Sequence, residues 1–241
     1  MFTRQPVKIS LFPAPVDSGI TVNGVRVNLE NISFCPWLSL KGILMLEHFL
    51  SACYGLGIDN LIVEIWGNEF PFFDGSSLKY LTLLQKAGIK RQNKAKDFLS
   101  LKNPLIEFQG DSFLAFLPGA KLEIRLFFSF PRLNFSSSFL LSNLNPKVYE
   151  REISWARTFG EYPFPSFLKR IGLSYEKKKG VFYSRKLRSP DEFARHKVLD
   201  LLGDLKILGR YLKGKIFAYN PYHHLTYRLL LRASEVENGK Q

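Results

Sequence analysis

Two histidine-containing segments hold residues whose types and spacing suit metal chemistry. In the segment 192–204, His196 and Asp200 are four residues apart, so a helix places them on one face, one turn from each other. An imidazole nitrogen and a carboxylate oxygen at that spacing can hold one metal ion together. A simple i, i+4 salt link on a surface helix is the alternative explanation of this pair.

The second segment is apolar except for Glu47 and His48. They stand inside the stretch 43–50, where a neighbouring acid and imidazole are costly to bury without partners. Adjacent residues on a helix diverge by about 100°. His48 can therefore reach a metal ion while Glu47 points to the neighbouring space, where a water on that metal would lie. A buried structural Glu–His pair is the alternative.

The motifs around these residues resemble those of the zinc-dependent UDP-3-O-acyl-N-acetylglucosamine deacetylases of lipid A synthesis. They occur in the same order and span most of the chain. The matching segments are LEHFLSA (46–52), GLGIDN (55–60), PFFDGS (71–76), LLQKAGI (83–89), ARTFG (156–160), DEFARHKVLDLLGD (191–204) and YNPYH (219–223). The segment 191–204 is the most specific of them.

The resemblance implies a zinc site with a base beside it. By similarity, His48, His196 and Asp200 would bind Zn²⁺ and leave a fourth position open to water, as in catalytic rather than structural sites. Glu47 would take the proton from that water, and the hydroxide would attack the acetamide carbonyl. Thr158 and the metal would stabilise the oxyanion.

The resemblance also implies an acid and two substrate contacts. His223, as imidazolium, would protonate the leaving amine, with Asp204 orienting and supporting it. Lys197 would bind polar groups of the substrate, and Phe159 would pack against its sugar or nucleotide. The products would be acetate and the free glucosamine amine.

The chain departs from the family pattern at several places. The family normally begins with a further strand and a glycine-rich loop, whereas this sequence starts near the family's second strand. The insert beside the acyl-chain passage is reduced to roughly residues 180–184, and Asn220 stands where the family has a lysine linked to the substrate's diphosphate. A one-residue slip would make His224 the catalytic histidine, but Tyr219 and Leu225 in their family positions favour His223. Because of these departures, a second hypothesis stays open: a binding or regulatory protein that retains zinc but has lost turnover.

Hydrophobic periodicity predicts an α+β fold of two similar α/β-sandwich domains. Alternation predicts strands at 7–12, 24–29, 61–66, 105–108, 113–117, 122–130, 180–183 and 215–219. Helical spacing predicts helices within 38–57 and at 78–87, 150–158, 164–171, 190–208 and 224–233. The polar stretch 90–97 separates a domain 1–93 from a domain 94–241. Each domain would hold a mostly antiparallel sheet, with helices packed between the two sheets and the active site at the domain interface.

The composition is basic and rich in aromatic residues. The 241 residues include 34 Lys+Arg against 21 Asp+Glu, for a net charge of +13, and 22 Phe. The charge alone would favour nucleic acid, but no nucleic-acid module is recognisable, so we expect none to bind. The UDP-linked acyl glucosamine implied by the resemblance explains the positive charge more directly. Its diphosphate is anionic, and its acyl chain links it to membrane lipids, so the protein could also contact the anionic membrane surface. With two cysteines and neither a spanning segment nor a secretory signal, we expect a cytoplasmic protein. We also expect it to be a monomer.

Overall fold

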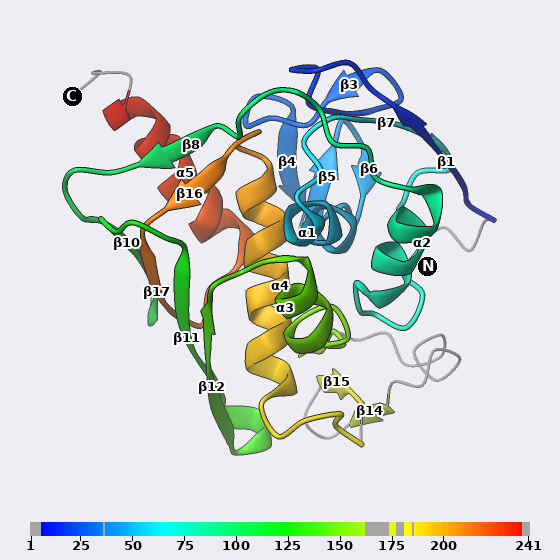
Figure 1. Cartoon of the computed structure of the whole chain (residues 1–241). Coiled ribbons are helices and arrows are strands. Elements are labelled where there is room, and N and C mark those ends of the chain that lie inside the picture. The colour runs from blue at the N-terminus through cyan, green and yellow to red at the C-terminus, as the bar shows by residue number, and fades with distance from the viewer. Residues whose placement is uncertain (1–5, 36, 162–173, 177–180, 185, 238–241) are drawn as a thin grey trace.

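The computed structural model describes residues 6–35, 37–161, 174–176, 181–184 and 186–237. It confirms the α+β class, with helices and mainly antiparallel sheets (Figure 1). Two helices, α1 (Glu47–Leu56) and α4 (Glu192–Lys206), pack against each other at the centre, between the strands of the two halves. This central helix pair carries the candidate site.

The first half of the chain contributes two sheets. One has the order β1-β7-β2-β3, and its strands are β1 (Lys8–Pro13), β2 (Ile20–Val22), β3 (Val25–Arg26) and β7 (Leu61–Trp66). The other is antiparallel and consists of β4 (Ile32–Cys35), β5 (Trp37–Leu40) and β6 (Ile43–Leu44). The helix α2 (Leu78–Ala87) follows them at its predicted bounds.

The second half is built on a five-stranded sheet of order β12-β11-β17-β10-β9. Only β11 and β17 run parallel in it. Its strands are β9 (Leu105–Gln109), β10 (Ser112–Leu117), β11 (Glu123–Phe130), β12 (Phe135–Ser142) and β17 (Lys215–Tyr219). The other elements are β8 (Phe98–Ser100), a 3-10 turn at Pro131–Leu133, α3 (Pro146–Glu152), β13 (Gly160–Glu161), β14 (Ser174–Glu176), β15 (Val181–Tyr183), β16 (Tyr211–Lys213) and α5 (His223–Glu237).

Each sheet in the described part takes all its strands from one side of residue 93, while the boundary itself stays a prediction. The parallel pairing of β8 with β16 brings the start of the second half to a strand just after α4. No helix among the described residues is long and apolar enough to cross a bilayer.

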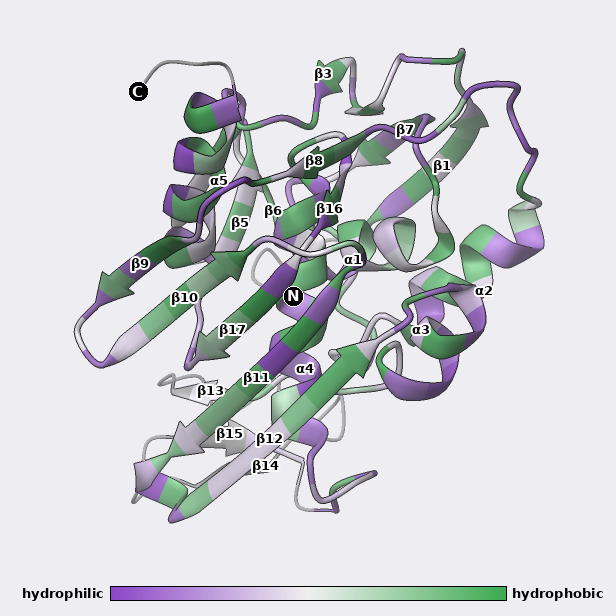
Figure 2. Ribbon diagram, turned by 60° about the vertical axis from the view of Figure 1, so that its left-hand side comes forward, coloured by the Kyte–Doolittle hydropathy of each residue, from purple (hydrophilic) through white to green (hydrophobic). Residues whose placement is uncertain are grey.

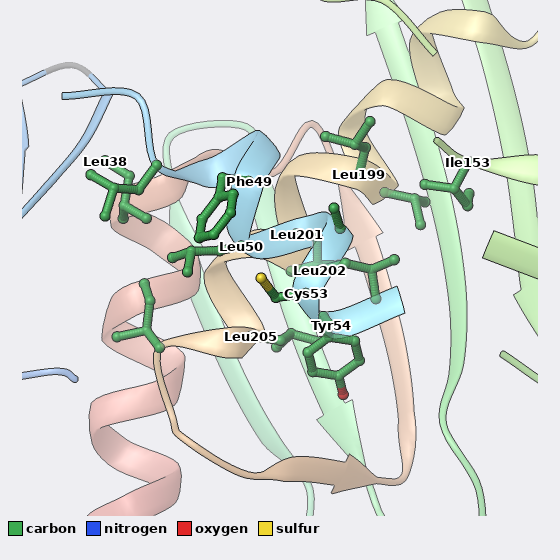
Figure 3. Packing of buried hydrophobic residues seen from close by; sticks show 14 of the residues in the cluster. Leu38, Phe49, Leu50, Cys53, Tyr54, Ile153, Leu199, Leu201, Leu202 and Leu205 are labelled. Atoms are coloured by element: carbon green, nitrogen blue, oxygen red, sulfur yellow. The ribbon is translucent and has the colours of Figure 1, made fainter. Parts of the chain in front are cut away.

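The core forms where α1 meets α4. Every residue of α1 is buried, as is typical of a helix surrounded by other elements. Figure 3 shows Leu50 and Cys53 of α1 among Leu201, Leu202 and Leu205 of α4. Burial of each such leucine side chain stabilises the folded state by about 2 kcal/mol. Because α1 is buried on all sides, the polar residues at its first turn also lie inside the protein.

The predicted helix within 38–57 is wrong in its first half. Residues 37–44 form the hairpin β5–β6, in which Leu40 pairs with Ile43. The two residues between them, Lys41 and Gly42, have φ of 48° and 90°, the left-handed pair that a tight two-residue hairpin needs. The helix α1 begins only at Glu47.

The predicted helix 150–158 is also displaced. Helix α3 starts at Pro146, because the side chain of Asn145 accepts hydrogen bonds from the backbone of Lys147 (3.0 Å) and Val148 (3.1 Å). Helix α3 ends at Glu152, so residues 156–158 are not helical and extend alongside α4. The strands that were not predicted include β2, β4, β8, β12, β13, β14 and β16. The strand expected at 24–29 is confined to Val25–Arg26. The helix expected at 164–171 lies outside the described residues.

Candidate active site

The crossing of α1 and α4 gathers three ligand-type side chains. The Nε2 atoms of His196 and His48 lie 3.3 Å and 3.6 Å from the same atom, Oδ1 of Asp200. One ligand atom from each of the three residues lies within 4.8 Å of the others. The two imidazole rings stand nearly perpendicular, at 87°. Such a set of two imidazoles and one carboxylate can hold a catalytic zinc ion.

A glycine allows the two helices to meet at this point. A Cβ atom on Gly203 of α4 would lie 2.2 Å from the carbonyl oxygen of Glu47. Only a residue without a side chain therefore lets α4 pass the first turn of α1 at backbone contact. This approach brings Glu47 and His48 against the turn of α4 that carries Asp200.

The protonation states of His196 and Asp200 fit metal binding. Nδ1 of His196 lies 3.0 Å from the carbonyl oxygen of Ala156, so Nδ1 carries the ring proton and donates a hydrogen bond to that oxygen. Nε2 is then unprotonated, and its lone pair faces Asp200. Burial lowers the pKa of His196 to about 4. Burial acts to raise the pKa of Asp200, but the neighbouring His196, the hydrogen bond from His48 and the positive charges of Lys197 and His223 hold it well below its usual range. A neutral imidazole and an ionised carboxylate are the forms that coordinate a metal ion.

Glu47 is the unsatisfied group of the site. The residue is buried, and its Oε2 atom has no hydrogen-bond partner among the described residues. Burial raises the pKa of its carboxyl, against the opposing effect of His223 and His48. A buried carboxylate oxygen without a partner calls for a missing polar group such as water or an ion. Its position beside His48 therefore fits a metal site with a water next to it.

Half-buried His223 and buried Asp204 form a second pair. Nδ1 of His223 lies 2.8 Å from Oδ1 of Asp204. Burial alone would lower the pKa of His223, but Asp204 outweighs it and raises this pKa to about 9. His223 is therefore an imidazolium at neutral pH. The ring of Phe34, which sequence reasoning missed, stacks on it with a centroid distance of 6.5 Å.

The neighbouring His224 lies in a different environment. It is exposed, and its Nδ1 lies 3.4 Å from the side-chain oxygen of Gln109. Of the two histidines at the start of α5, only His223 reaches Asp204. The geometry thus favours His223 for the acid role.

The two predicted substrate residues lie beside the ligands. Nζ of Lys197 is 3.6 Å from Oδ2 of Asp200 and 5.6 Å from the centroid of the Phe159 ring. Phe159 is 9% exposed, and its ring lies 4.3 Å from Phe193 and 5.9 Å from His196, between centroids. Phe159 therefore belongs to the aromatic packing that supports the site and offers a substrate little of its surface.

Thr158 is half-buried two residues after Ala156, whose carbonyl group holds His196. Its backbone N–H donates to the carbonyl of Gly75 at 2.8 Å. The segment 156–158 is therefore held between α4 on one side and the turn 74–77 on the other.

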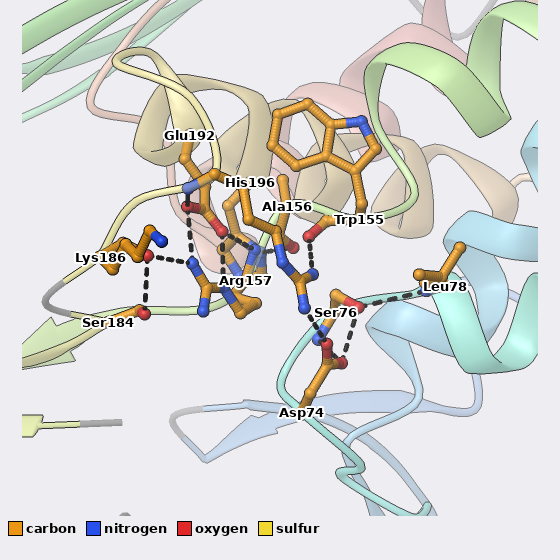
Figure 4. A network of polar contacts seen from close by, with 11 residues as sticks. Asp74, Ser76, Leu78, Trp155, Ala156, Arg157, Ser184, Lys186, Glu192 and His196 are labelled. Carbon is orange, nitrogen blue, oxygen red and sulfur yellow. Dashed lines mark hydrogen bonds and ion pairs between the residues drawn. The ribbon is translucent and has the colours of Figure 1, made fainter. Parts of the chain in front are cut away.

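A polar network that sequence reasoning missed anchors this segment (Figure 4). Arg157 donates from Nε (2.8 Å) and Nη2 (3.0 Å) to the two carboxylate oxygens of Glu192, the first residue of α4. The backbone N–H groups of Arg157 (3.0 Å) and Arg188 (2.6 Å) donate to the same carboxylate. Nη2 of Arg188 in turn donates to Asp74 at 2.8 Å. The sequence offered one signal for this network: Glu192 lies near the start of the predicted helix 190–208, and Arg157 lies in the motif ARTFG (156–160).

Replacing Glu192 by glutamine is expected to lower the free energy of unfolding by about 2 kcal/mol at neutral pH, because Arg157 loses its charged partner. Hydrogen bonds from Arg157 and Arg188 lower the pKa of Glu192 against the effect of burial. The contribution is therefore complete above the unfolded pKa and is lost as the pH falls through the folded one. Urea unfolding of wild type and E192Q should converge below about pH 4. An E30Q variant, at an exposed site, should match wild type at every pH.

Asn220 has a structural role that its sequence position did not indicate. It has a φ of 45°, and its side-chain oxygen accepts a hydrogen bond from the backbone N–H of Ser129 at 2.8 Å. Its own N–H donates to the carbonyl of Phe127 at 3.1 Å. Asn220 thus continues the pairing of β17 with β11 beyond the end of β17.

The family model described as LpxC, UDP-3-O-acyl N-acetylglycosamine deacetylase, matches residues 1–234. The chain belongs to this family. Among its similar relatives are proteins named UDP-3-O-acyl-N-acetylglucosamine deacetylase from three bacteria. That of Saccharophagus degradans is 34% identical, over 99% of this chain and 87% of the relative. That of Syntrophus aciditrophicus is 34% identical (95% and 80%), and that of Xanthomonas campestris pv. campestris is 35% identical (95% and 84%). The ligand-type cluster thus lies in a chain with the LpxC motifs along nearly its whole length.

Proposed function

We propose that this protein is a zinc-dependent hydrolase of lipid A biosynthesis that removes the N-acetyl group from UDP-3-O-acyl-N-acetylglucosamine. The products are acetate and the UDP-linked acyl glucosamine with a free amine. The convergence of His48, His196 and Asp200 on one point, beside the unpartnered carboxylate of Glu47, carries this proposal. Membership of the LpxC family supports it.

His48, His196 and Asp200 would hold the zinc ion, with His196 oriented by the carbonyl of Ala156. When bound, the metal supplies Lewis-acid polarisation of the acetamide carbonyl and of the attacking water. The orphaned oxygen of Glu47 and the ionised Asp200 are consistent with a cation at this point.

The chain's own residues handle the protons. Glu47 accepts a proton from the water that attacks the carbonyl carbon, and burial, which raises its pKa, makes it a stronger base than an exposed carboxylate. His223 holds its Nδ1 proton toward Asp204 and carries a second proton on Nε2. It gives this second proton to the nitrogen as the C–N bond breaks. The Thr158 hydroxyl donates to the oxyanion, and Lys197 binds polar groups of the substrate.

Acetate release from UDP-3-O-acyl-N-acetylglucosamine tests the proposal, together with the zinc content of the purified protein. Chelation should abolish release, and added Zn²⁺ should restore it. Asp200→Ala should lose both zinc and activity, whereas Asp111→Ala, at an exposed turn, should keep both. Full activity without metal would contradict the proposal. Bound zinc and bound substrate without acetate release would instead indicate a binding protein that has lost turnover.

A further inference from the structure

The five-stranded sheet has one face toward the helices and the other toward solvent (Figure 2). The strand register arranges the outward side chains in rows across the sheet. One row consists of Ile106, Ala115, Phe217, Arg125 and Leu140, and the next of Phe108, Phe113, Tyr219, Phe127 and Ser138. We call these two rows the aromatic face. Most of its members are large and apolar, although they lie on the solvent side of the sheet.

Four large apolar side chains of the aromatic face are exposed, whereas Phe113, Phe217 and Tyr219 are half-buried and Ala115 is buried. Phe108 is 62% exposed, Phe127 46%, Ile106 45% and Leu140 44%. In the second row, the ring of Phe113 lies 6.2 Å from Phe108 and 6.3 Å from Tyr219, between centroids. The rings of Phe108, Phe113 and Tyr219 therefore support one another. A contiguous exposed patch of this kind marks an interaction surface.

The charges on and beside the aromatic face are mainly positive. Arg125 stands in the first row between Phe217 and Leu140 and forms no ion pair with a described residue. Exposed Lys215 lies in the row beyond, next to Glu123, and exposed Lys121 lies in the connection between β10 and β11.

The acidic residues of these strands and turns offset part of this charge. Glu107 of β9 points inward, where Arg228 and Arg232 of α5 pair with it. Glu123 lies beside Lys215, and Asp111 stands at the far turn of the β9–β10 hairpin. Two copies packed face to face would bring together chains that each carry a net charge of +13. An anionic occupant fits this face better than a second copy.

We propose that the aromatic face docks on an anionic lipid surface. Aromatic and aliphatic side chains that insert at the headgroup level, with arginine and lysine beside the lipid phosphates, are the combination that holds proteins at such interfaces. The face lies one sheet away from the candidate site: Phe127 points outward, while its neighbour Phe128 points inward and packs on Phe159, 4.8 Å away between centroids. The inference does not depend on the proposed reaction.

Co-sedimentation of the full chain with lipid vesicles tests this inference. Wild type should bind vesicles that contain phosphatidylglycerol and bind pure phosphatidylcholine much more weakly. The double variant Phe108→Ser/Phe127→Ser should bind the anionic vesicles roughly tenfold more weakly. Arg125→Gln should weaken binding about fivefold. The matched control is Phe12→Ser. Phe12 is 42% exposed on β1, in the sheet β1-β7-β2-β3, and this variant should bind like wild type.

A second measurement does not depend on loss of binding. In anionic vesicles with brominated lipid, Phe127→Trp should show more tryptophan quenching than wild type with its three native tryptophans, whereas Phe12→Trp should show no increase. Equal binding of wild type and the double variant would overturn the proposal, because it would assign binding to net charge alone. A wild-type dimer that the double variant converts to a monomer in light scattering would also overturn it, with a second copy as the occupant.

Discussion

Replacing Glu47 by glutamine is expected to lower acetate release by roughly 10²–10⁴-fold, the usual contribution of a positioned general base. Glutamine keeps the shape of the side chain but cannot accept the proton from water. Initial rates with the UDP-linked substrate measure the loss, and zinc content should stay at the wild-type level because Glu47 is not among the three ligand-type residues.

The same variant should not be less stable than wild type. Because Oε2 of Glu47 has no partner among the described residues, an NH2 group in its place breaks no hydrogen bond there, and the neutral amide avoids burying a charge. Unfolding in urea measures this. Glu64→Gln, at an exposed position of β7, serves as the control for rate and stability. A rate for E47Q within a few-fold of wild type would place the base elsewhere.

Replacing Gly203 by alanine is expected to destabilise the protein by about 1–3 kcal/mol or more, since the new Cβ would lie 2.2 Å from the backbone oxygen of Glu47. The helices must separate to admit it, which moves Glu47 and His48 away from Asp200. Activity and zinc content should therefore fall together with stability. Urea unfolding, acetate release and metal analysis measure the three effects.

Gly55 offers a matched comparison for this variant. A Cβ there would lie 2.1 Å from the ring of Tyr149, so here the obstacle is a side chain rather than backbone. Gly55→Ala should be partly rescued by Tyr149→Ala in a double-mutant cycle. Gly203→Ala should not be rescued by Glu47→Ala, because the obstructing carbonyl remains. Wild-type stability of the Gly203→Ala variant would show that the helices do not meet as described.

Local signals predicted several elements well. Strand β7, helix α2 and strand β17 have their predicted bounds. Turn residues or a stop glycine beside them, with clear periodicity inside, explain this success. The hairpin β5–β6 was mistaken for helix because a short apolar run does not distinguish the two. The helix predicted at 150–158 begins too late because the prediction did not use the capping signal of Asn145 and Pro146.

The sequence by itself determined the family, the α+β class and the pairing of His196 with Asp200, because motif order and helical spacing are properties of the chain. Only the tertiary structure decided that His48 meets the same Asp200 oxygen, that Ala156 orients His196 and that Glu47 is left without a partner. It also turned four large apolar residues of one sheet outward, to solvent. These contacts join segments far apart in the chain. They depend on how closely α1 and α4 approach at Gly203 and on which side of the sheet the helices cover, and no local pattern specifies either.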